Sequence, residues 1–298
     1  MSAGAATQRE IDSQPECWRR AARMAAEQAS ILPPQGARVA AAGCGTSLYV
    51  AQSYAASREA AGHGETDAFP ASELPAGRRY DALVVVSRSG TTTEVARLLE
   101  RGTGARRTIA IVADASSPVA RLADGVVELA FADEQSVVQT RFATSALALL
   151  RAHLGDDVDA LAEQASAALQ SSLPVVVNHY EHFVFLGSGA AVGLAAEAAL
   201  KLREAAGAFT ESYPAMEYRH GPISVAGPRT LVWVLGPLLG EGLAALADDI
   251  RATGATVVTS EADALPALVL AQRAAVALAQ SRGLDPDAPR NLTRSVVL

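Results

Sequence analysis

A short apolar run passes directly into a glycine-rich turn at residues 39–47, which read Val39-Ala40-Ala41-Ala42-Gly43-Cys44-Gly45-Thr46-Ser47. The apolar run is typical of a buried strand, and the residues from Ser47 to Gly62 predict a helix. Glycines let the backbone turn sharply, and the N–H groups at a helix start attract anions. The stretch therefore predicts a strand, a turn that can bind an anion, and a helix. An ordinary tight turn with a helix cap would have the same residues, and both interpretations stay open from this stretch alone.

On both sides of this stretch, short apolar runs alternate with helical segments of about 10–15 residues. We expect strands at 38–42, 82–86 and 108–112, and helices at 15–30, 47–62 and 92–101. Such alternation is the pattern of a parallel, doubly wound sheet with helices on its faces. The predicted fold class is α/β.

The second half of the chain repeats the pattern of the first. The run Phe183-Val184-Phe185-Leu186-Gly187-Ser188-Gly189 resembles the opening stretch, with Gly187 lying 144 residues after Gly43. The helices that follow both end in Arg-Glu-Ala-Ala-Gly, at residues 58–62 and 203–207. Chance similarity of apolar strands is the alternative, but the shared pentapeptide favours a tandem duplication. We expect a helical segment over 1–35 and two similar domains over 36–172 and 173–298, each a parallel sheet flanked by helices.

Composition excludes several classes of partner. The chain has 298 residues and a formal net charge of −7, whereas nucleic-acid binding needs a basic surface, so no nucleic-acid partner is expected. Two cysteines, Cys17 and Cys44, are too few for a disulfide framework or a structural zinc site. The chain starts without an apolar signal segment, and no uncharged apolar run reaches the roughly 18 residues of a membrane span. We expect a cytoplasmic protein with no membrane partner and no cofactor.

Hydroxyl side chains gather in a second loop, Ser87-Arg88-Ser89-Gly90-Thr91-Thr92-Thr93, after the strand expected at 82–86. Five hydroxyls in seven residues are far more than the single Ser or Thr that caps a helix. Ligands of parallel sheets bind outside the carboxyl ends of the strands, which is where both loops are expected. The two loops together predict a site for one phosphate group.

Three ionisable residues, Glu197, Lys201 and Glu204, lie at i, i+4 and i+7 in the helix expected from Val192 to Ala206. This spacing places them on one face of the helix. Lys201 is the only lysine in the chain, so a mechanism that needs an amine has one candidate. A solvated face with ordinary ion pairs is the common explanation of such a pattern, but the surrounding Ala and Leu favour a buried face.

One of the five histidines, His220, lies in a loop that Gly221 and Pro222 constrain. No HxxxH pair or cysteine cluster accompanies it, so no metal site is expected. The others are expected at exposed or linker positions without a role: His63, His153, His179 and His182.

With these residues in place, the chain resembles the tandem sugar isomerase (SIS) family, in particular the isomerase part of glucosamine-6-phosphate synthase and its stand-alone relatives. The resemblance covers the chain from about Arg38 to the C-terminus. It rests on five motifs in the family's order: Gly43-Cys44-Gly45-Thr46-Ser47, Ser87-Arg88-Ser89-Gly90-Thr91-Thr92, Ala199-Leu200-Lys201-Leu202-Arg203-Glu204, Tyr218-Arg219-His220-Gly221-Pro222 and Pro289-Arg290-Asn291-Leu292.

The resemblance implies roles for individual residues. It implies that Glu204, beside Lys201 and Glu197, moves a proton between C1 and C2 of a sugar phosphate. It also implies that His220 opens the sugar ring, reaching in from the other subunit of a homodimer. The residues that would hold the phosphate or border the sugar are Gly45, Thr46, Ser47, Ser87, Ser89, Thr92, Val137 and Thr140.

The sequence departs from the family's pattern at three points. Arg294 stands where the synthase has a lysine that forms a Schiff base, which a permanently protonated guanidinium cannot do. Arg88 stands where the family has a neutral amide, and both arginines are expected at the substrate. The synthase's N-terminal glutaminase domain is missing, so glutamine-dependent amination is not expected.

The function predicted from these residues is a phosphosugar-processing enzyme that works through an enol or enolamine intermediate. An aldose–ketose isomerase, an amino-sugar phosphate deaminase and a fructosamine-phosphate deglycase all fit the motifs, and the identity of the sugar is open. The alternative class is a non-catalytic regulatory protein that binds a sugar phosphate on the same fold. About 35 residues precede the first strand, too few for a helix-turn-helix domain, which favours the enzyme.

Overall fold

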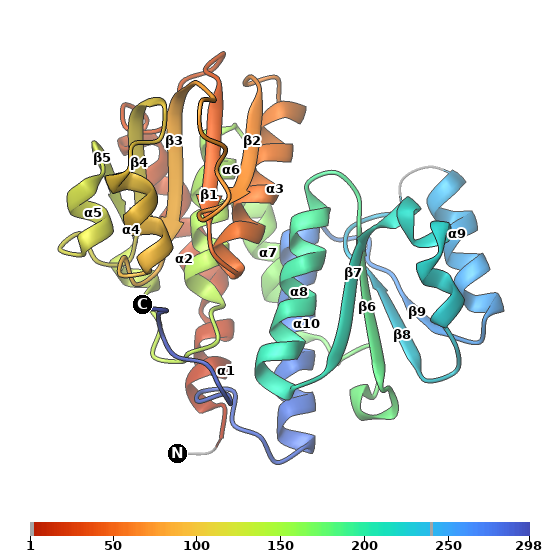
Figure 1. Ribbon diagram of the computed structural model, residues 1–298. Helices are drawn as coiled ribbons and strands as arrows, with labels where there is room; N and C mark the ends of the chain where they lie inside the picture. Colours follow the sequence, from red (N-terminus) through yellow and green to blue (C-terminus); the bar gives the residue numbers. More distant parts are fainter. Residues whose placement is uncertain (1–2, 239–240) are drawn as a thin grey trace. The chain divides into compact units, whose positions relative to one another are not determined.

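The computed structural model describes residues 3–238 and 241–298, which form two compact units, each built on one parallel sheet (Figure 1). The β1–β5 unit comprises Ser13–Gln135, Gln139–Ala160 and Thr293–Leu298. The β6–β9 unit comprises the residues up to Asp12, Ser136–Val138 and Leu161–Leu292.

The sheet of the β1–β5 unit has five parallel strands in the order β2-β1-β3-β4-β5. Helices α4 and α5 pack together on one face, and α3 and α6 pack on the other, with α2 against α6 (Figure 1). The strands are β1 (Val39–Gly43), β2 (Thr66–Pro70), β3 (Tyr80–Ser87), β4 (Ala105–Val112) and β5 (Gly125–Glu128). The helices are α2 (Gln14–Glu27), α3 (Thr46–Ala60), α4 (Thr93–Glu100), α5 (Pro118–Leu122), the 3-10 turn η1 (Ala130–Ala132) and α6 (Arg141–His153).

The central strands of this sheet are buried on both faces. In β3, Leu83 and Val85 pack in one cluster with Val95 and Leu98 of α4, while their neighbour Val84, pointing to the opposite face, is also fully buried. Parallel strands covered by helices on both sides need such continuous apolar runs, which is why the sequence shows them without alternation.

The sheet of the β6–β9 unit has four parallel strands in the order β7-β6-β8-β9. Helices α8 and α10 pack together, α1 lies against α10, and α9 packs with η3 and strand β9. The strands are β6 (His182–Gly187), β7 (Phe209–Pro214), β8 (Thr230–Val234) and β9 (Thr256–Val258). The helices are α1 (Ala5–Asp12), α7 (Val158–Gln170, which begins in the β1–β5 unit), η2 (Val177–His179), α8 (Ala191–Ala206), η3 (Ala215–His220), η4 (Pro222–Val225), α9 (Glu241–Ala252) and α10 (Ala264–Ser281).

The α/β class and the parallel sheets expected from the sequence are confirmed. The two sheets also share the beginning of their strand order, because β2-β1-β3-β4 and β7-β6-β8-β9 follow the same pattern along the chain. In each sheet the order reverses beside the first strand, between β1 and β3 and between β6 and β8. The carboxyl ends of the strands at such a reversal point are the usual ligand position in folds of this kind.

Helix α10 is the one helix in the described ranges that is long and apolar enough to cross a membrane, with a mean hydropathy of 1.2. Its residues are 67% buried within the structure. That burial is typical of a core helix, and α8 is its main packing partner.

Arg58, from the first copy of the repeated pentapeptide, is fully buried at the end of α3. Its Nη1 donates to the carbonyl oxygens of Ala37 (3.0 Å) and Gly64 (3.1 Å) and to the Thr66 hydroxyl (2.9 Å). Its Nη2 donates to the carbonyl oxygen of Pro34 at 2.8 Å. A single guanidinium thus satisfies backbone carbonyls of the loop before β1 and of the loop between α3 and β2.

We expect Arg58→Met to lower the free energy of unfolding by at least about 3 kcal/mol, since three backbone carbonyls would lose a donor. The matched control is Arg203→Met, at the same position of the second pentapeptide, where the arginine is exposed and the expected change is within about 0.5 kcal/mol. Urea unfolding followed by circular dichroism measures both. Equal midpoints for the two variants would contradict the role of Arg58.

Candidate functional site

The two hydroxyl-rich loops lie at the carboxyl ends of β1 and β3, on either side of the point where the strand order reverses. The turn after β1 needs glycine, because a Cβ on Gly43 would lie 2.6 Å from the backbone carbon of Ser47. This close approach places the first turn of α3 directly against the strand end. Thr46 and Ser47, the first two residues of α3, are each 4% exposed.

Ser87 and Thr92 have hydroxyls available to a ligand. The Oγ atom of Ser87 is buried at the end of β3 and has no hydrogen-bond partner within residues 3–238 and 241–298. Thr92 is the N-cap residue of α4, yet its side chain makes no capping hydrogen bond. A buried hydroxyl without a partner is costly, so an acceptor or donor supplied by a ligand at Ser87 would be stabilising.

The other hydroxyls of this loop contact the C-terminal segment Thr293–Leu298, which belongs to the same unit. The Oγ of Ser295 lies 3.1 Å from that of Ser89 and 2.9 Å from the Oγ1 of Thr91. Further along, the N–H of Thr93 donates to the carbonyl oxygen of Val296, and the N–H of Leu298 donates to the Thr93 hydroxyl. The segment therefore runs along the loop, and Ser295 was not anticipated from the sequence.

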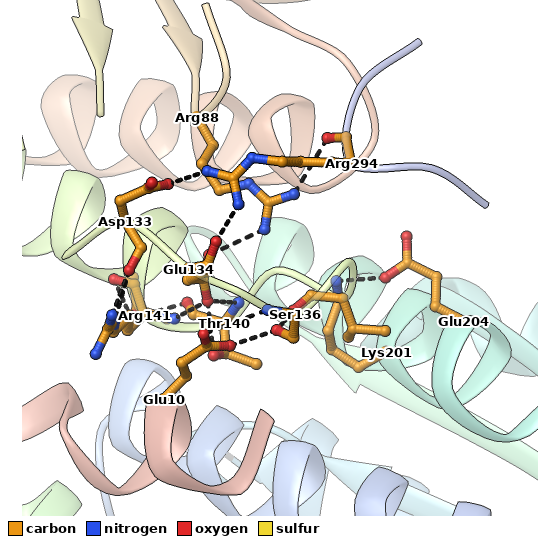
Figure 2. A network of polar contacts seen from close by, with 12 residues as sticks. Glu10, Arg88, Asp133, Glu134, Ser136, Thr140, Arg141, Lys201, Glu204 and Arg294 are labelled. Atoms are coloured by element: carbon orange, nitrogen blue, oxygen red, sulfur yellow. Dashed lines mark hydrogen bonds and ion pairs between the residues drawn. The ribbon is translucent and has the colours of Figure 1, made fainter. Parts of the chain in front are cut away.

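Arg88 is buried, with 2% of its surface exposed, and its charge is paired. Its Nη1 lies 3.5 Å from Oε2 of Glu134, and its Nη2 donates to the carbonyl oxygen of Arg294 at 3.1 Å (Figure 2). The arginine of this loop is thus accompanied by a carboxylate. Glu134 was not anticipated from the sequence, because it lies 46 positions from Arg88 and belongs to no local motif.

Glu134 also holds the start of helix α6. Its Oε1 accepts the N–H and the hydroxyl of Thr140, at 2.5 and 2.8 Å, and the N–H of Arg141 at 2.8 Å (Figure 2). A carboxylate is favourable at a helix N-terminus because it neutralises the positive end of the helix dipole. Through Glu134, the hydroxyl loop at Arg88 and the segment at Thr140 are joined.

Arg294 makes its contacts on the same segment. Its Nη2 lies 2.5 Å from Oδ1 of Asp133, and its Nη1 donates to the carbonyl oxygen of Glu134. These two contacts hold the Arg294 guanidinium against residues 133 and 134. Asp133 was likewise not anticipated from the sequence.

In the β6–β9 unit, helix α8 brings Glu197, Lys201 and Glu204 into one cluster, as their spacing predicts. The Nζ atom of Lys201 lies 2.5 Å from Oε2 of Glu204 and 3.3 Å from Oε1 of Glu197. The side chains of Lys201 and Glu197 are 1% and 2% exposed, whereas that of Glu204 is 20% exposed. The face is buried rather than solvated, and Glu204 is the member of the cluster that a ligand can reach.

Glu204 lines a cavity of about 560 Å³ in this unit. The cavity walls are the end of α8 at residues 203–207 and the residues 283–285 and 288–291 near the end of the chain. Cavities of this size commonly hold small molecules.

His220 is exposed at the end of η3, and in the described part of the chain no hydrogen bond or ion pair joins it to α8. Its loop is anchored by Tyr218, which is fully buried in the core of the unit with its ring 5.8 Å from that of Tyr213. Gly221 follows with a φ of 133°, a conformation that favours glycine. His220 is thus held on a fixed turn with its ring free.

The other four histidines were expected at exposed or linker positions, but His182 and His153 are half-buried in β6 and α6 and make contacts. The Nε2 of His182 lies 2.7 Å from Oε2 of Glu211, and the side chain is only 14% exposed. The Nε2 of His153 lies 3.0 Å from the carbonyl oxygen of Pro33. His182 begins β6 and faces β7, a pairing that the sequence alone did not predict.

Val137, expected to border the sugar, is held in the β6–β9 unit by the chain's N-terminal helix and its C-terminal region. Its N–H donates to the carbonyl oxygen of Asp287, and the neighbouring Ser136 donates its hydroxyl to Glu10 of α1. The Asp287 carboxylate in turn accepts the N–H and hydroxyl of Thr7, both at 2.7 Å, and the N–H of Ala6 at 2.9 Å. One network therefore joins α1, segment 136–138 and residue 287.

The pKa of Asp287 lies below its ordinary value. Burial alone would raise this pKa, but the hydrogen bonds from Thr7 and Ala6, together with the charge of Arg9, outweigh that effect. Because the folded pKa is below the unfolded one, the ionised carboxylate stabilises the fold above the unfolded pKa of about 3.9. That contribution is lost as the pH falls through the folded value.

We expect Asp287→Asn to reduce the free energy of unfolding by about 1–3 kcal/mol at pH 6, where the lost partner is a charged acceptor. The difference between the variant and the parent should shrink at pH 3, below the unfolded pKa of about 3.9. Urea unfolding at the two pH values measures it. A difference that is as large at pH 3 as at pH 6 would contradict the assignment.

The chain is similar to known proteins in sequence. No protein-family model matches it. It is 28% identical over 280 residues to the isomerizing glutamine–fructose-6-phosphate aminotransferase of Rhizobium leguminosarum bv. viciae, covering 76% of this chain and 45% of the relative. Its identity to the corresponding enzyme of Symbiobacterium thermophilum is 30% over 269 residues, covering 74% of this chain and 44% of the relative. The chain thus spans a little under half the length of these relatives.

Solved structures with the same fold cover nearly the whole chain. Glucosamine-6-phosphate deaminase from Thermotoga maritima superposes with a TM-score of 0.85 and 26% identity, over 99% of this chain and 100% of the other. The C-terminal domain of glucosamine-fructose-6-phosphate aminotransferase from Francisella tularensis gives 0.82 and 20% over 94% and 97%. Tagatose-6-phosphate ketose/aldose isomerase from Escherichia coli gives 0.78 and 21% over 99% and 98%, and these two show the fold alone.

Proposed function

We propose that this chain, whose homologues are the SIS isomerase part of glutamine–fructose-6-phosphate aminotransferases, is an enzyme that moves a proton between C1 and C2 of a sugar phosphate. The resemblance to the SIS family drawn from the five motifs is confirmed by these homologues and by the structural neighbours. The observation that carries the proposal is the cluster on α8, in which one partly exposed carboxylate, Glu204, is held by the buried ammonium of Lys201 at 2.5 Å.

The chain is proposed to contain two SIS domains, over 36–172 and 173–298, after a helical segment over 1–35. The shared strand order of the two sheets and the repeated Arg-Glu-Ala-Ala-Gly support this division. Homodimerisation, a cytoplasmic location and the absence of a nucleic-acid partner belong to the same proposal. The exposure of His220 supports a role toward a second subunit, because within its own unit the ring has no partner among the residues described.

The phosphate of the substrate is proposed to bind at the loops after β1 and β3. Gly45, Thr46 and Ser47 offer the start of a helix, where N–H groups and the dipole favour an anion. Ser87 and Thr92 add hydroxyls that make no hydrogen bond in the described chain. Ser89 would take part by exchanging its contact with Ser295 for one with the ligand.

Glu204 is proposed as the base that takes the proton from one carbon and returns it to the other. A carboxylate that is largely shielded from water suits this task. The Lys201 ammonium pairs with Glu204 and orients it, and with Arg294 in place of a lysine no Schiff base is part of the mechanism. His220 would pass a proton between a sugar hydroxyl and the ring oxygen during ring opening.

Isomerisation and removal of an amine share this proton transfer and differ in the step after it. The structural neighbours include a deaminase and a ketose/aldose isomerase, so both outcomes have precedent on this fold. In an isomerisation, Glu204 returns the proton to the other carbon of the enediol and no atom is lost. In the deaminase or deglycase, the proton shift gives an imine that water hydrolyses to the carbonyl and a free amine.

We expect Ser87→Ala to raise the dissociation constant for fructose 6-phosphate at least tenfold, because the variant removes a hydrogen bond to a charged group, about 1.5–3 kcal/mol. Ser145→Ala is the matched control, since Ser145 is another buried serine of the same unit whose Oγ has no partner in the described chain. Calorimetry measures both. An unchanged affinity in the Ser87 variant would exclude this residue from the phosphate site.

We expect Glu204→Gln to lower the rate at which the C1 or C2 hydrogen exchanges with deuterated water at least 100-fold, while the affinity for the sugar phosphate is retained. Glu59→Gln is the matched control, because Glu59 is the equivalent residue of the first pentapeptide and bonds the N–H of Thr66. Proton NMR of hexose and hexosamine 6-phosphates follows the exchange. Near-normal exchange in the Glu204 variant would refute the mechanism. A protein that binds a sugar phosphate and never exchanges its hydrogens would instead be the regulatory binding protein.

A further inference from the structure

The two copies of the pentapeptide Arg-Glu-Ala-Ala-Gly place their arginines in opposite environments. Arg58 is fully buried and donates to four acceptors around β1. Arg203 is exposed, and its one hydrogen bond in the described chain is a long one, 3.4 Å from Nε to the carbonyl oxygen of Ala199. Both terminal nitrogens of Arg203 are therefore open to a ligand.

The loop that follows each helix contributes to this difference, because it supplies one of the four acceptors of Arg58. Five residues separate α3 from β2, and the carbonyl oxygen of Gly64 in this loop turns onto the Arg58 guanidinium. Only Gly207 and Ala208 separate α8 from β7, so this loop has no residue in the position of Gly64. Arg203 therefore does not bind loop carbonyls as Arg58 does.

Arg203 lines the 560 Å³ cavity beside Glu204, and so does Arg290 from the C-terminal region. Neither arginine has a carboxylate within ion-pair distance in residues 3–238 and 241–298. The one other carboxylate of the lining, Asp285, is engaged, because its Oδ1 accepts the N–H groups of Gly4 (2.8 Å) and Asp287 (3.0 Å). The cavity thus has two guanidinium groups that form no ion pair in the described part of the chain.

The same cavity also offers negative charge. Glu204 and the C-terminal end of α8 both line the cavity, and the negative end of a helix dipole favours a positively charged group. A molecule with an amine near Glu204 and a carboxylate near the arginines matches both charges. An α-amino acid has this arrangement, and a planar guanidinium binds a carboxylate through two parallel hydrogen bonds.

We propose that the cavity beside Glu204 binds the amino-acid part of a ketose phosphate whose C1 carries that amino acid through its nitrogen, with Arg203 and Arg290 as the carboxylate-recognising residues. This proposal rests on the proposed role of Glu204. If the reacting carbon lies at Glu204, whatever is attached to it through nitrogen extends into the adjoining cavity. An unsubstituted hexose phosphate would leave both guanidiniums without a partner.

The reaction on such a substrate balances with water alone. Glu204 takes a proton from C1 of the ketosamine, and the electron pair forms the C1–C2 double bond of an enaminol. Return of the proton to C2 gives an imine between C1 and nitrogen. Water adds to C1 and the C–N bond breaks, which yields an aldose phosphate and the free amino acid.

The test compares three substrates: the C1 adducts of fructose 6-phosphate with glycine and with methylamine, and fructose 6-phosphate itself. The glycine adduct differs from the methylamine adduct only in its carboxylate. We expect the parent protein to prefer the glycine adduct at least tenfold in kcat/KM. Arg290→Gln and Arg203→Gln should each raise KM for the glycine adduct at least tenfold, with kcat changed less than twofold, and leave the methylamine adduct unaffected.

Arg290→Lys separates bidentate recognition from simple charge attraction, and recovery of less than half of the lost preference is expected. Arg121→Gln, an exposed arginine of α5 outside the cavity, is the control and should behave as the parent. Equal kcat/KM for the two adducts in the parent, or equal losses on both in the variants, would overturn the proposal. The protein could also exchange the hydrogens of fructose 6-phosphate but neither turn over the glycine adduct nor bind it in calorimetry. That result would overturn this proposal, while the proposed function would stand. Absence of any exchange that depends on Glu204 would refute the proposed function itself.

Discussion

Each unit depends on a helix that begins directly against the end of a strand, with no space for a side chain between them. A Cβ on Gly43 would lie 2.6 Å from the Ser47 backbone, and a Cβ on Gly187 would lie 2.2 Å from the carbonyl oxygen of Ala191. This contact places the first turns of α3 and α8 at the edge where the strand order of each sheet reverses. The first turn of α3 therefore brings the hydroxyls of Thr46 and Ser47 to this edge. Further along α8 lies the cluster of Glu197, Lys201 and Glu204.

The same backbone arrangement supports different chemistry in the two units. In the first, the Arg-Glu pair of the pentapeptide secures the neighbouring backbone, since Arg58 binds loop carbonyls and Glu59 accepts the N–H of Thr66. In the second, Glu204 pairs with Lys201 and Arg203 faces a cavity. Similar local sequence therefore does not imply a similar role, because the acceptors that hold Arg58 all lie outside the pentapeptide, before β1 and around the start of β2.

Local patterns were sufficient to predict the central strands and the α8 cluster. Apolar runs such as Leu83–Val86 give buried strands wherever helices cover both faces, and i, i+4, i+7 spacing fixes a helix face without reference to the rest of the fold. The edge strands β2 and β9 could not be predicted, because β2 has no continuous apolar run and ends in Pro70, and β9 has only three residues. The Arg88–Glu134 pair, and the contact of Ser295 with the hydroxyl loop, join residues that lie far apart in the chain, and no local pattern indicates such pairs.

The burial of Lys201 has a consequence for the chemistry of the protein's exterior. Because it is the only lysine and its side chain is 1% exposed, every cationic side chain on the surface other than histidine is a guanidinium. Guanidinium groups stay protonated above pH 12, whereas lysine ammonium groups begin to lose their charge near pH 10. The positive component of the surface charge therefore stays constant through the alkaline range, and reagents that acylate side-chain amines find no accessible target on the folded chain.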